Sequence, residues 1–72
     1  MKASDLIGKD VIDGEGNTLG KVENLVIDEY SGVIKGIDVK EKPNLISSEV
    51  NPIIFRKINN ITNIIKLKPE II

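Results

Sequence analysis

The apolar residues of this chain come in short, β-branched runs that are interrupted every few residues by turn-forming residues. Isoleucine alone accounts for 14 of the 72 residues, against one Phe and one Tyr. β-branched side chains are stiff at χ1 and pack well on a pleated sheet. Between the turns, no stretch of a dozen residues has the i, i+3, i+4, i+7 spacing of an amphipathic helix. The chain is therefore expected to be an all-β protein built from short strands.

Turn signals divide the chain into six expected strands. Gly, Asn, Ser and Pro cluster between the apolar runs, where they favour tight turns and loops. Six short strands with a turn every 8 to 12 residues or so are typical of a small barrel or sandwich. One short helical turn is expected near residues 55–58. The strands are expected at residues 9–13, 19–29, 33–41, 49–54, 58–61 and 64–68.

The second expected strand changes phase along its length. Gly20 and Val22 share one face by the period of two. The next apolar pair, Leu25 and Ile27, is shifted by one residue around Glu23-Asn24. An extra residue that flips the register is a β-bulge, and bulges bend strands into barrels. We expect a bulge at this point.

The third expected strand alternates more regularly. Val33, Ile37 and Val39 share one face, with Lys35 as the exception. Gly36 lies inside the strand, where glycine often marks a bend or the close approach of another backbone.

The composition removes most catalytic chemistry. The chain has no Cys, no His and no Trp, so it holds no thiolate or imidazole for nucleophilic catalysis, proton transfer or an ordinary zinc site. Catalysis by carboxylates needs two of them in one cleft, with pKa values shifted from the ordinary range. Asp28 and Glu29 lie beside a turn at residues 30–32 and are expected to stabilise it instead. We expect no enzyme activity, no metal site and no cofactor.

One acidic segment is similar to the start of a calcium loop. Asp13–Asn17 places oxygen-bearing side chains at alternate positions. An EF-hand loop also needs Gly at its position 6 and Glu at its position 12, and this chain has Thr18 and Asn24 there. A polar hairpin turn is the expected structure.

Charge is distributed unevenly, although the net charge is −1. Residues 1–32 carry three bases and seven acids, whereas residues 33–72 carry seven bases and four acids. The two halves either form complementary patches, between subunits or toward a partner, or are solvated strand faces. Nucleic-acid surfaces combine basic residues with stacking aromatics. Phe55 is the one aromatic neighbour here, so at most weak, salt-sensitive contact with RNA is expected through Arg56, Lys57, Lys66 and Lys68.

No apolar run of 18 residues predicts a membrane span. The segment Met1–Asp5 has no signal-peptide core. Together with the lack of Cys, these features predict a cytoplasmic protein with no direct membrane insertion. A single domain is expected over residues 1–72.

The last third of the chain holds more Ile than a small sheet is expected to bury. Ile64 and Ile65 are adjacent, so they point to opposite faces of a strand. A domain of this size buries only about 60% of its unfolded surface, and surplus apolar surface often marks a subunit or partner interface. The residues predicted at a partner or homodimer interface are Ile53, Phe55, Ile65, Leu67, Ile71 and Ile72.

Roughly the first 40 residues resemble a PRC-barrel domain. The resemblance rests on Ala3–Asp13, Gly16–Asp28 and Ser31–Ile37. The family pattern is similar: a Leu-x-Gly-Lys-x-Val opening, a Gly-x-x-Leu-Gly-Lys-Val turn and strand, an acidic hairpin with Gly, and a short strand. The later part departs from the pattern, because Ile54 stands where Pro is expected and Arg56-Lys57 stand where acids are common.

This resemblance implies a six-stranded barrel, often dimeric, that is an assembly and adaptor module and not a catalyst. PRC-barrels occur in the photosynthetic reaction-centre H subunit, in the ribosome maturation factor RimM and as short free-standing proteins, especially in archaea. The chain is most similar to the free-standing class, some members of which act in cell division with the FtsZ membrane anchor SepF. The resemblance thus implies a self-associating adaptor of archaeal cell division with a SepF-like protein partner. The alternative is a ribosome- or RNA-maturation-associated adaptor that resembles the RimM barrel and binds a ribosomal protein.

Overall fold

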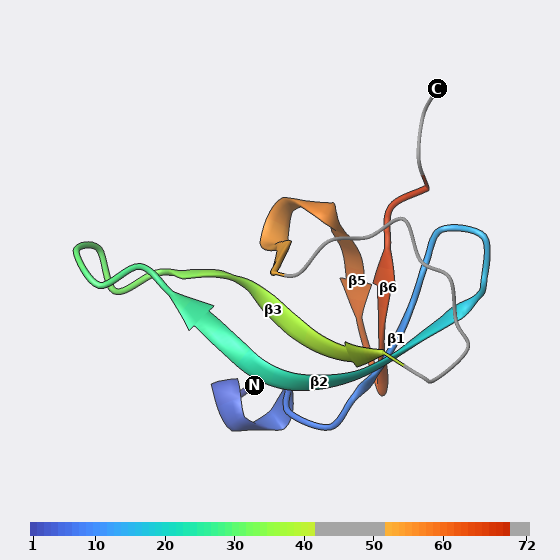
Figure 1. The fold of residues 1–72 in the computed structure, drawn as a ribbon, viewed down its shortest axis with the longest axis horizontal. Coiled ribbons are helices and arrows are strands. Elements are labelled where there is room, and N and C mark those ends of the chain that lie inside the picture. The colour runs from blue at the N-terminus through green and yellow to red at the C-terminus, as the bar shows by residue number, and fades with distance from the viewer. Residues whose placement is uncertain (42–51, 70–72) are drawn as a thin grey trace.

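Six strands form one strongly curled sheet in the computed structural model, which describes residues 1–41 and 52–69 (Figure 1). The strand order is β4-β3-β2-β1-β6-β5, and neighbouring strands are antiparallel except for the parallel pair β1 and β6. This curled half-barrel confirms the predicted all-β, PRC-type fold. Its elements are η1 (Ala3–Asp5), β1 (Asp10–Ile12), β2 (Thr18–Ile27), β3 (Ile34–Glu41), β4 (Ile53–Ile54), η2 (Phe55–Lys57), β5 (Ile58–Ile61) and β6 (Ile64–Leu67).

The two 3-10 turns differ in how far the sequence predicts them. η2 confirms the helical turn expected near residues 55–58. η1 was not expected, because three residues are too few to show a helical period. It is closed locally, since the backbone N–H of Lys2 donates to the Asp5 carboxylate at 2.8 Å. Of the strand expected at residues 49–54, the part at 49–51 lies outside the described residues.

The bulge predicted in β2 is confirmed by the register of β2 against β3. Val22 pairs with Val39, whereas Asn24 pairs with Asp38, so Glu23 is the extra residue. A bulge sharpens the local twist and bend of a strand, which lets the long β2–β3 pair curl around the core.

A second register shift explains why Lys35 breaks the alternation of β3. Val26 pairs with Gly36, but Ile27 pairs with Ile34, which leaves Lys35 without a residue opposite it. With strict alternation, Val33 would share a face with Ile37. The shift puts Ile34 on that face instead, beside Ile27. The sequence indicated that the alternation is interrupted at Lys35, but it did not indicate that Ile34 would replace Val33 on the face of Ile37.

Gly36 lies where another backbone approaches β3 closely, as predicted. It pairs with Ile54 of β4. A Cβ at Gly36 would contact the carbonyl oxygen of Ile53 and would lie 3.0 Å from its carbonyl carbon. The absence of a side chain is therefore what allows β4 to pack at this position.

The core fills the inside of the curl. Its residues come from β1, β2, β3, β4 and β6, with one more from the turn after η1, and half-buried side chains of β2, η2 and β5 pack against it. Among the described residues, no buried side chain is polar or charged. In the same part of the chain, no helix has the length and apolar character to cross a bilayer. The buried hydrophobic residues are Leu6, Val11, Leu19, Val22, Ile37, Val39, Ile53, Ile65 and Leu67.

Candidate functional site

Three of the residues predicted at an interface belong to the core. Ile53, Ile65 and Leu67 are at most 2% exposed, so the folded barrel does not offer their side chains to a partner. Phe55 is half-buried and packs against the same core. Ile71 and Ile72 lie outside the described residues.

The mistake at β6 has a simple physical origin. Adjacent residues of a strand point to opposite faces, and the prediction took the two Ile as surplus without using the next two residues, which put Lys66 on the face of Ile64 and Leu67 on the face of Ile65. In the structure Ile65 and Leu67 point inward, whereas Ile64 is only half-buried and Lys66 is exposed. Exposed apolar surface in the described part of the chain therefore lies on residues other than these.

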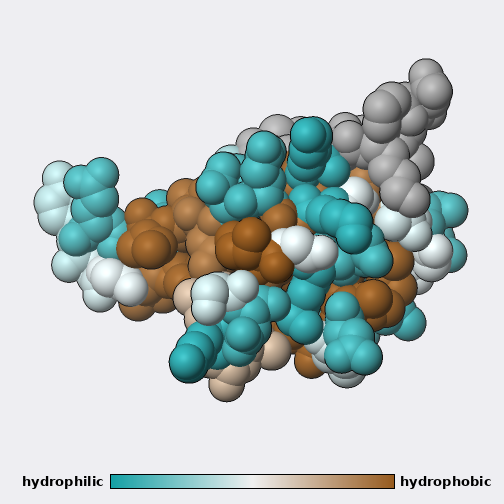
Figure 2. All heavy atoms as spheres, turned by 90° about the horizontal axis from the view of Figure 1, so that it is seen from below, coloured by the Kyte–Doolittle hydropathy of each residue, from teal (hydrophilic) through white to brown (hydrophobic). Residues whose placement is uncertain are grey.

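Part of it lies on the hairpin that β2 and β3 extend beyond the body of the molecule, called here the arm (residues 25–36; Figure 1), while Met1 and Ile7 are exposed near the N-terminus. Ile27 is 56% exposed and Val33 is 60% exposed, and Tyr30 at the tip is fully exposed. Figure 2 shows the resulting hydrophobic surface along the arm, between its hydrophilic tip and the body.

The apolar surface of the arm continues the stripe that fills the core. Leu25 pairs with the buried Ile37, and one step further out Ile27 pairs with Ile34. Paired residues share a sheet face. Leu25 still packs against the core, but Ile27 lies beyond it. The stripe thus runs from the interior onto exposed surface.

The tip of the arm is a tight acidic turn. The Asp28 carboxylate accepts hydrogen bonds from the backbone N–H of Tyr30 at 2.9 Å and of Ser31 at 3.4 Å. The backbone N–H of Gly32, at φ +73°, donates to the Asp28 carbonyl at 2.8 Å. The Tyr30 N–H, helped by the Ser31 N–H and the charge of Lys35, lowers the pKa of Asp28. Asp28 therefore fixes the turn as a carboxylate.

A second acidic turn, between β1 and β2, engages its carboxylate in the same manner. Asp13 accepts from the backbone N–H of Glu15 at 2.9 Å and of Asn17 at 2.8 Å, and from the Asn17 side-chain amide at 3.2 Å. Burial alone raises the pKa of Asp13, but these hydrogen bonds outweigh it and the pKa is lowered. The segment is a polar hairpin turn, as predicted. Within residues 1–41 and 52–69, no cluster of three or more acidic side chains could hold a metal ion.

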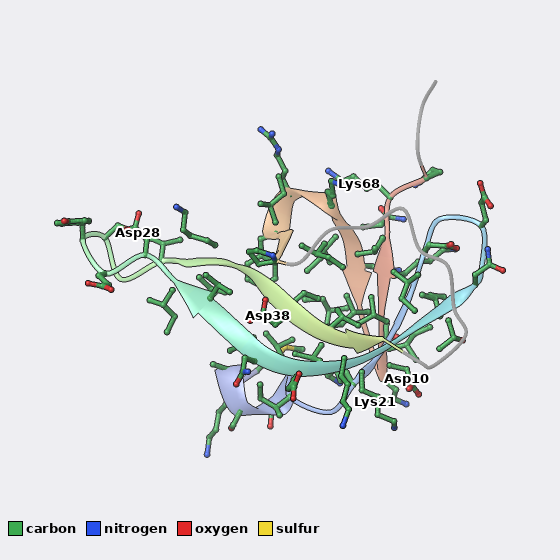
Figure 3. The ribbon with its side chains drawn as sticks, viewed as in Figure 1. Asp10, Lys21, Asp28, Asp38 and Lys68 are labelled. Carbon is green, nitrogen blue, oxygen red and sulfur yellow. The ribbon has the colours of Figure 1, made fainter. Side chains whose placement is uncertain are left out.

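The predicted basic residues lie mainly at one end of the barrel. The backbone N–H of Lys68, after β6, donates to the carbonyl of Lys57 in η2 at 2.7 Å. This contact brings Arg56, Lys57 and Lys68 to the same end, called here the basic end; Figure 3 shows Lys68 there. Ile54, 36% exposed, directly precedes η2.

The basic end lacks the aromatic surface that favours RNA. Phe55 is half-buried against the core, and the exposed Tyr30 lies at the tip of the arm. Bases bind single-stranded sites by stacking on exposed rings, so the described residues offer cations here without a stacking platform.

Surplus Ile in the sequence does not indicate the arm, whereas unequal strand length does. β2 has 10 residues and β3 has 8, whereas β1 has 3 and β6 has 4. Strands this short cannot cover the full length of the β2–β3 pair. The difference in length is present among the expected strands too, because those at residues 19–29 and 33–41 are the longest.

The chain matches a known family over nearly its whole length. A family model described as the PRC-barrel domain matches residues 1–70. No curated protein sequence matches the chain. The family match and the six-stranded curled sheet agree with each other. The chain belongs to the PRC-barrel domain family, whose domains are generally protein-interaction modules.

Proposed function

We propose that this chain is a non-catalytic, self-associating docking module that binds protein through the apolar surface of its arm. The observation that supports the proposal is the exposure of Ile27 and Val33 on a two-stranded ribbon that leaves the core. A two-stranded ribbon is only marginally stable in water, so covering it with a partner both buries apolar area and holds the ribbon.

The size of the effect follows from the exposed area. Full burial of an aliphatic side chain is worth about 1.5–3 kcal/mol. Because Ile27 and Val33 are a little over half exposed, each contributes on the order of 1 kcal/mol when a partner covers it. The charged tip around Asp28 and Glu29 forms a polar rim, which sets orientation more than affinity.

The test is a double variant that changes polarity and keeps strand propensity. Ile27→Thr with Val33→Thr preserves β-branching, so we expect the fold to remain and partner binding to fall at least about tenfold. The matched control is Ile12→Thr, because Ile12 is a half-buried residue of β1, and β1 lies away from the arm tip (Figure 1). Loss of binding in the control but not in the arm variant would contradict the proposal.

The finer proposal is that the module is a cytoplasmic adaptor of archaeal cell division with a SepF-like partner. It rests on the resemblance to free-standing PRC-barrels. A pull-down from native lysate with the wild type, the arm variant and Ile12→Thr tests it: we expect the division protein with the wild type and control, and not with the arm variant. Recovery of ribosomal proteins in that arm-dependent pattern would instead support the RimM-like alternative.

A further inference from the structure

We propose that an extended, basic-ended segment of another protein adds as a strand to the open edge of β2 in the arm. This inference rests on the proposed docking function and names how the partner binds and what chemistry it carries. It is supported by the backbone groups that β2 exposes beyond its pairing with β1, and by the acids at both ends of that stretch.

β1 and the residues just before it cover only part of one edge of β2. On that edge the N–H of Val22 donates to the carbonyl of Lys9 at 3.0 Å, and the carbonyl of Val22 accepts from the N–H of Gly8 at 2.9 Å. Among the described residues, no backbone pairs with this edge of β2 beyond Val22. The arm continues well past this point, since Lys21 lies at the body and Asp28 at the tip (Figure 3).

The backbone groups of Leu25 and Ile27 face this open edge. Along an antiparallel strand, successive residues direct their N–H and C=O groups alternately to the two sides. The N–H of Asp28 donates to the carbonyl of Val33 on the β3 side at 2.9 Å. The bulge of β2 at Glu23 lies before this stretch, so unbroken alternation directs Ile27 and Leu25 to the other side. Their four backbone groups form a template for one more strand, in the row that a longer β1 would fill.

The side chains along this edge select the kind of strand that fits. Ile27 is exposed, and Leu25 and Val26 are half-buried, so a strand beside them gains most from apolar, β-branched residues. Glu23 and Glu29 are exposed acids at the two ends, and neither forms an ion pair within the described part of the chain. The matching segment is therefore short, extended and apolar, with Lys or Arg at each end.

The same charges disfavour a second copy of this chain at the edge. Two arms paired edge to edge about a two-fold axis at Val26 would place Glu23 of each copy beside Glu29 of the other. Like charges directly opposite each other across two strands are destabilising. Lys35, the one base of the arm, lies on β3 and not on this edge.

Synthetic peptides with matched side chains test the strand addition on the wild-type protein. The parent peptide is Lys-Val-Thr-Val-Thr-Val-Lys, and its two variants are N-methylated on the last two valines or on both threonines. Because valine and threonine N–H groups point to opposite edges, one variant should bind at least about tenfold more weakly than the parent. The other variant should stay within a few-fold of the parent. Fluorescence anisotropy at low salt measures all three, and a peptide with Glu at both ends should bind several-fold more weakly.

Two variants of the chain locate the edge. Ile27→Ala removes the side chain, and Ile27→Pro also removes the N–H that faces the edge, while the pairing with β3 is kept. The proline variant should bind the parent peptide about fivefold more weakly than the alanine variant. Equal binding by the two N-methylated peptides, or equally tight binding of the Glu-ended peptide, overturns the inference.

Other outcomes separate this inference from the proposed function. If the parent peptide does not bind, but a lysate partner is still lost in the Ile27→Thr, Val33→Thr variant, the strand addition is wrong and the docking function stands. If the amides of Leu25 and Ile27 gain exchange protection in concentrated protein without peptide, a second copy fills the edge and the inference is wrong.

Discussion

At the scale of single residues, the fold depends on positions where a side chain is either absent or held in hydrogen bonds. Gly36 lets the backbone of Ile53 pack against β3. Asp13 and Asp28 each use a carboxylate to close a turn beside a strand. The sequence indicated the roles of Gly36 and Asp28, because glycine inside a strand and aspartate beside a turn have specific local meanings. For Asp13 it indicated only that the segment is a polar turn.

Gly36→Ala should destabilise the barrel. Its Cβ would meet backbone atoms of Ile53, which cannot rotate away as a side chain would, so we expect a loss of about 1–3 kcal/mol in the free energy of unfolding. Urea denaturation measures it. Gly32→Asn in the arm turn is the control, because Asn tolerates the positive φ there and should cost much less. Equal stabilities for Gly36→Ala and the wild type would show that β4 does not pack as described.

Asp13 should make stability depend on pH in the acidic range. Its pKa is lowered in the folded state, so its contribution is complete above the unfolded-state pKa of about 4 and is lost as pH falls through the folded-state pKa. Asp13→Asn should be less stable at neutral pH, by no more than about 1 kcal/mol because solvent screens the turn.

Thermal unfolding from neutral to acidic pH checks this expectation for Asp13. The wild type and Asp13→Asn should converge as the pH falls below about 4. A difference that stays constant down to strongly acidic pH would mean that the carboxylate charge has no part in the turn.

At the scale of elements, sequence pattern predicted strands and turns well and faces less well. The six strands, the β2 bulge and η2 lie where the pattern of apolar and turn residues indicates. The inward face of β6 could have been predicted from the period of two, because Ile65 shares a face with Leu67 whereas Ile64 shares the other face with Lys66. The arm is harder to recognise, because its apolar alternation matches that of a core strand, and only the shortness of β1 and β6 shows that these two strands do not cover it.

The adjacent residues Ile64 and Ile65 of β6 provide a test of which side chain faces the core. Ile65→Ala leaves a cavity in the core and should cost about 2–5 kcal/mol of unfolding free energy, since Ile65 is completely buried. Ile64→Ala removes the same atoms from a half-buried position and should cost clearly less. Chemical denaturation of the two variants measures the difference, and the reverse order would place Ile65 on the surface as the sequence first suggested.

The arm should be the least protected part of the paired sheet in the monomer. Its hydrogen bonds lie beyond the core, and local opening is cheapest where few buried contacts hold a segment. Amide hydrogen exchange in dilute protein should be faster at Val26 and Ile34 than at Val22 and Val39, which pair with each other over the core. Equal protection along both strands would mean that the arm is stable without a partner.

At the scale of the whole molecule, a small barrel buries one face of a curled sheet and leaves a strand pair reaching into solvent. The absence of Cys and His limits the chemistry available to the chain, while the arm and the basic end give it two surfaces of opposite charge. The central claim is that the arm is the surface through which this barrel binds protein, a second copy included.

Backbone amide NMR over a concentration series tests that claim most directly, because a chain of 7.9 kDa gives resolved spectra. Concentration-dependent shifts should include the arm, and should disappear in the Ile27→Thr, Val33→Thr variant. Shifts that gather instead on the outer faces of β1 and β6 and persist in that variant would contradict the claim.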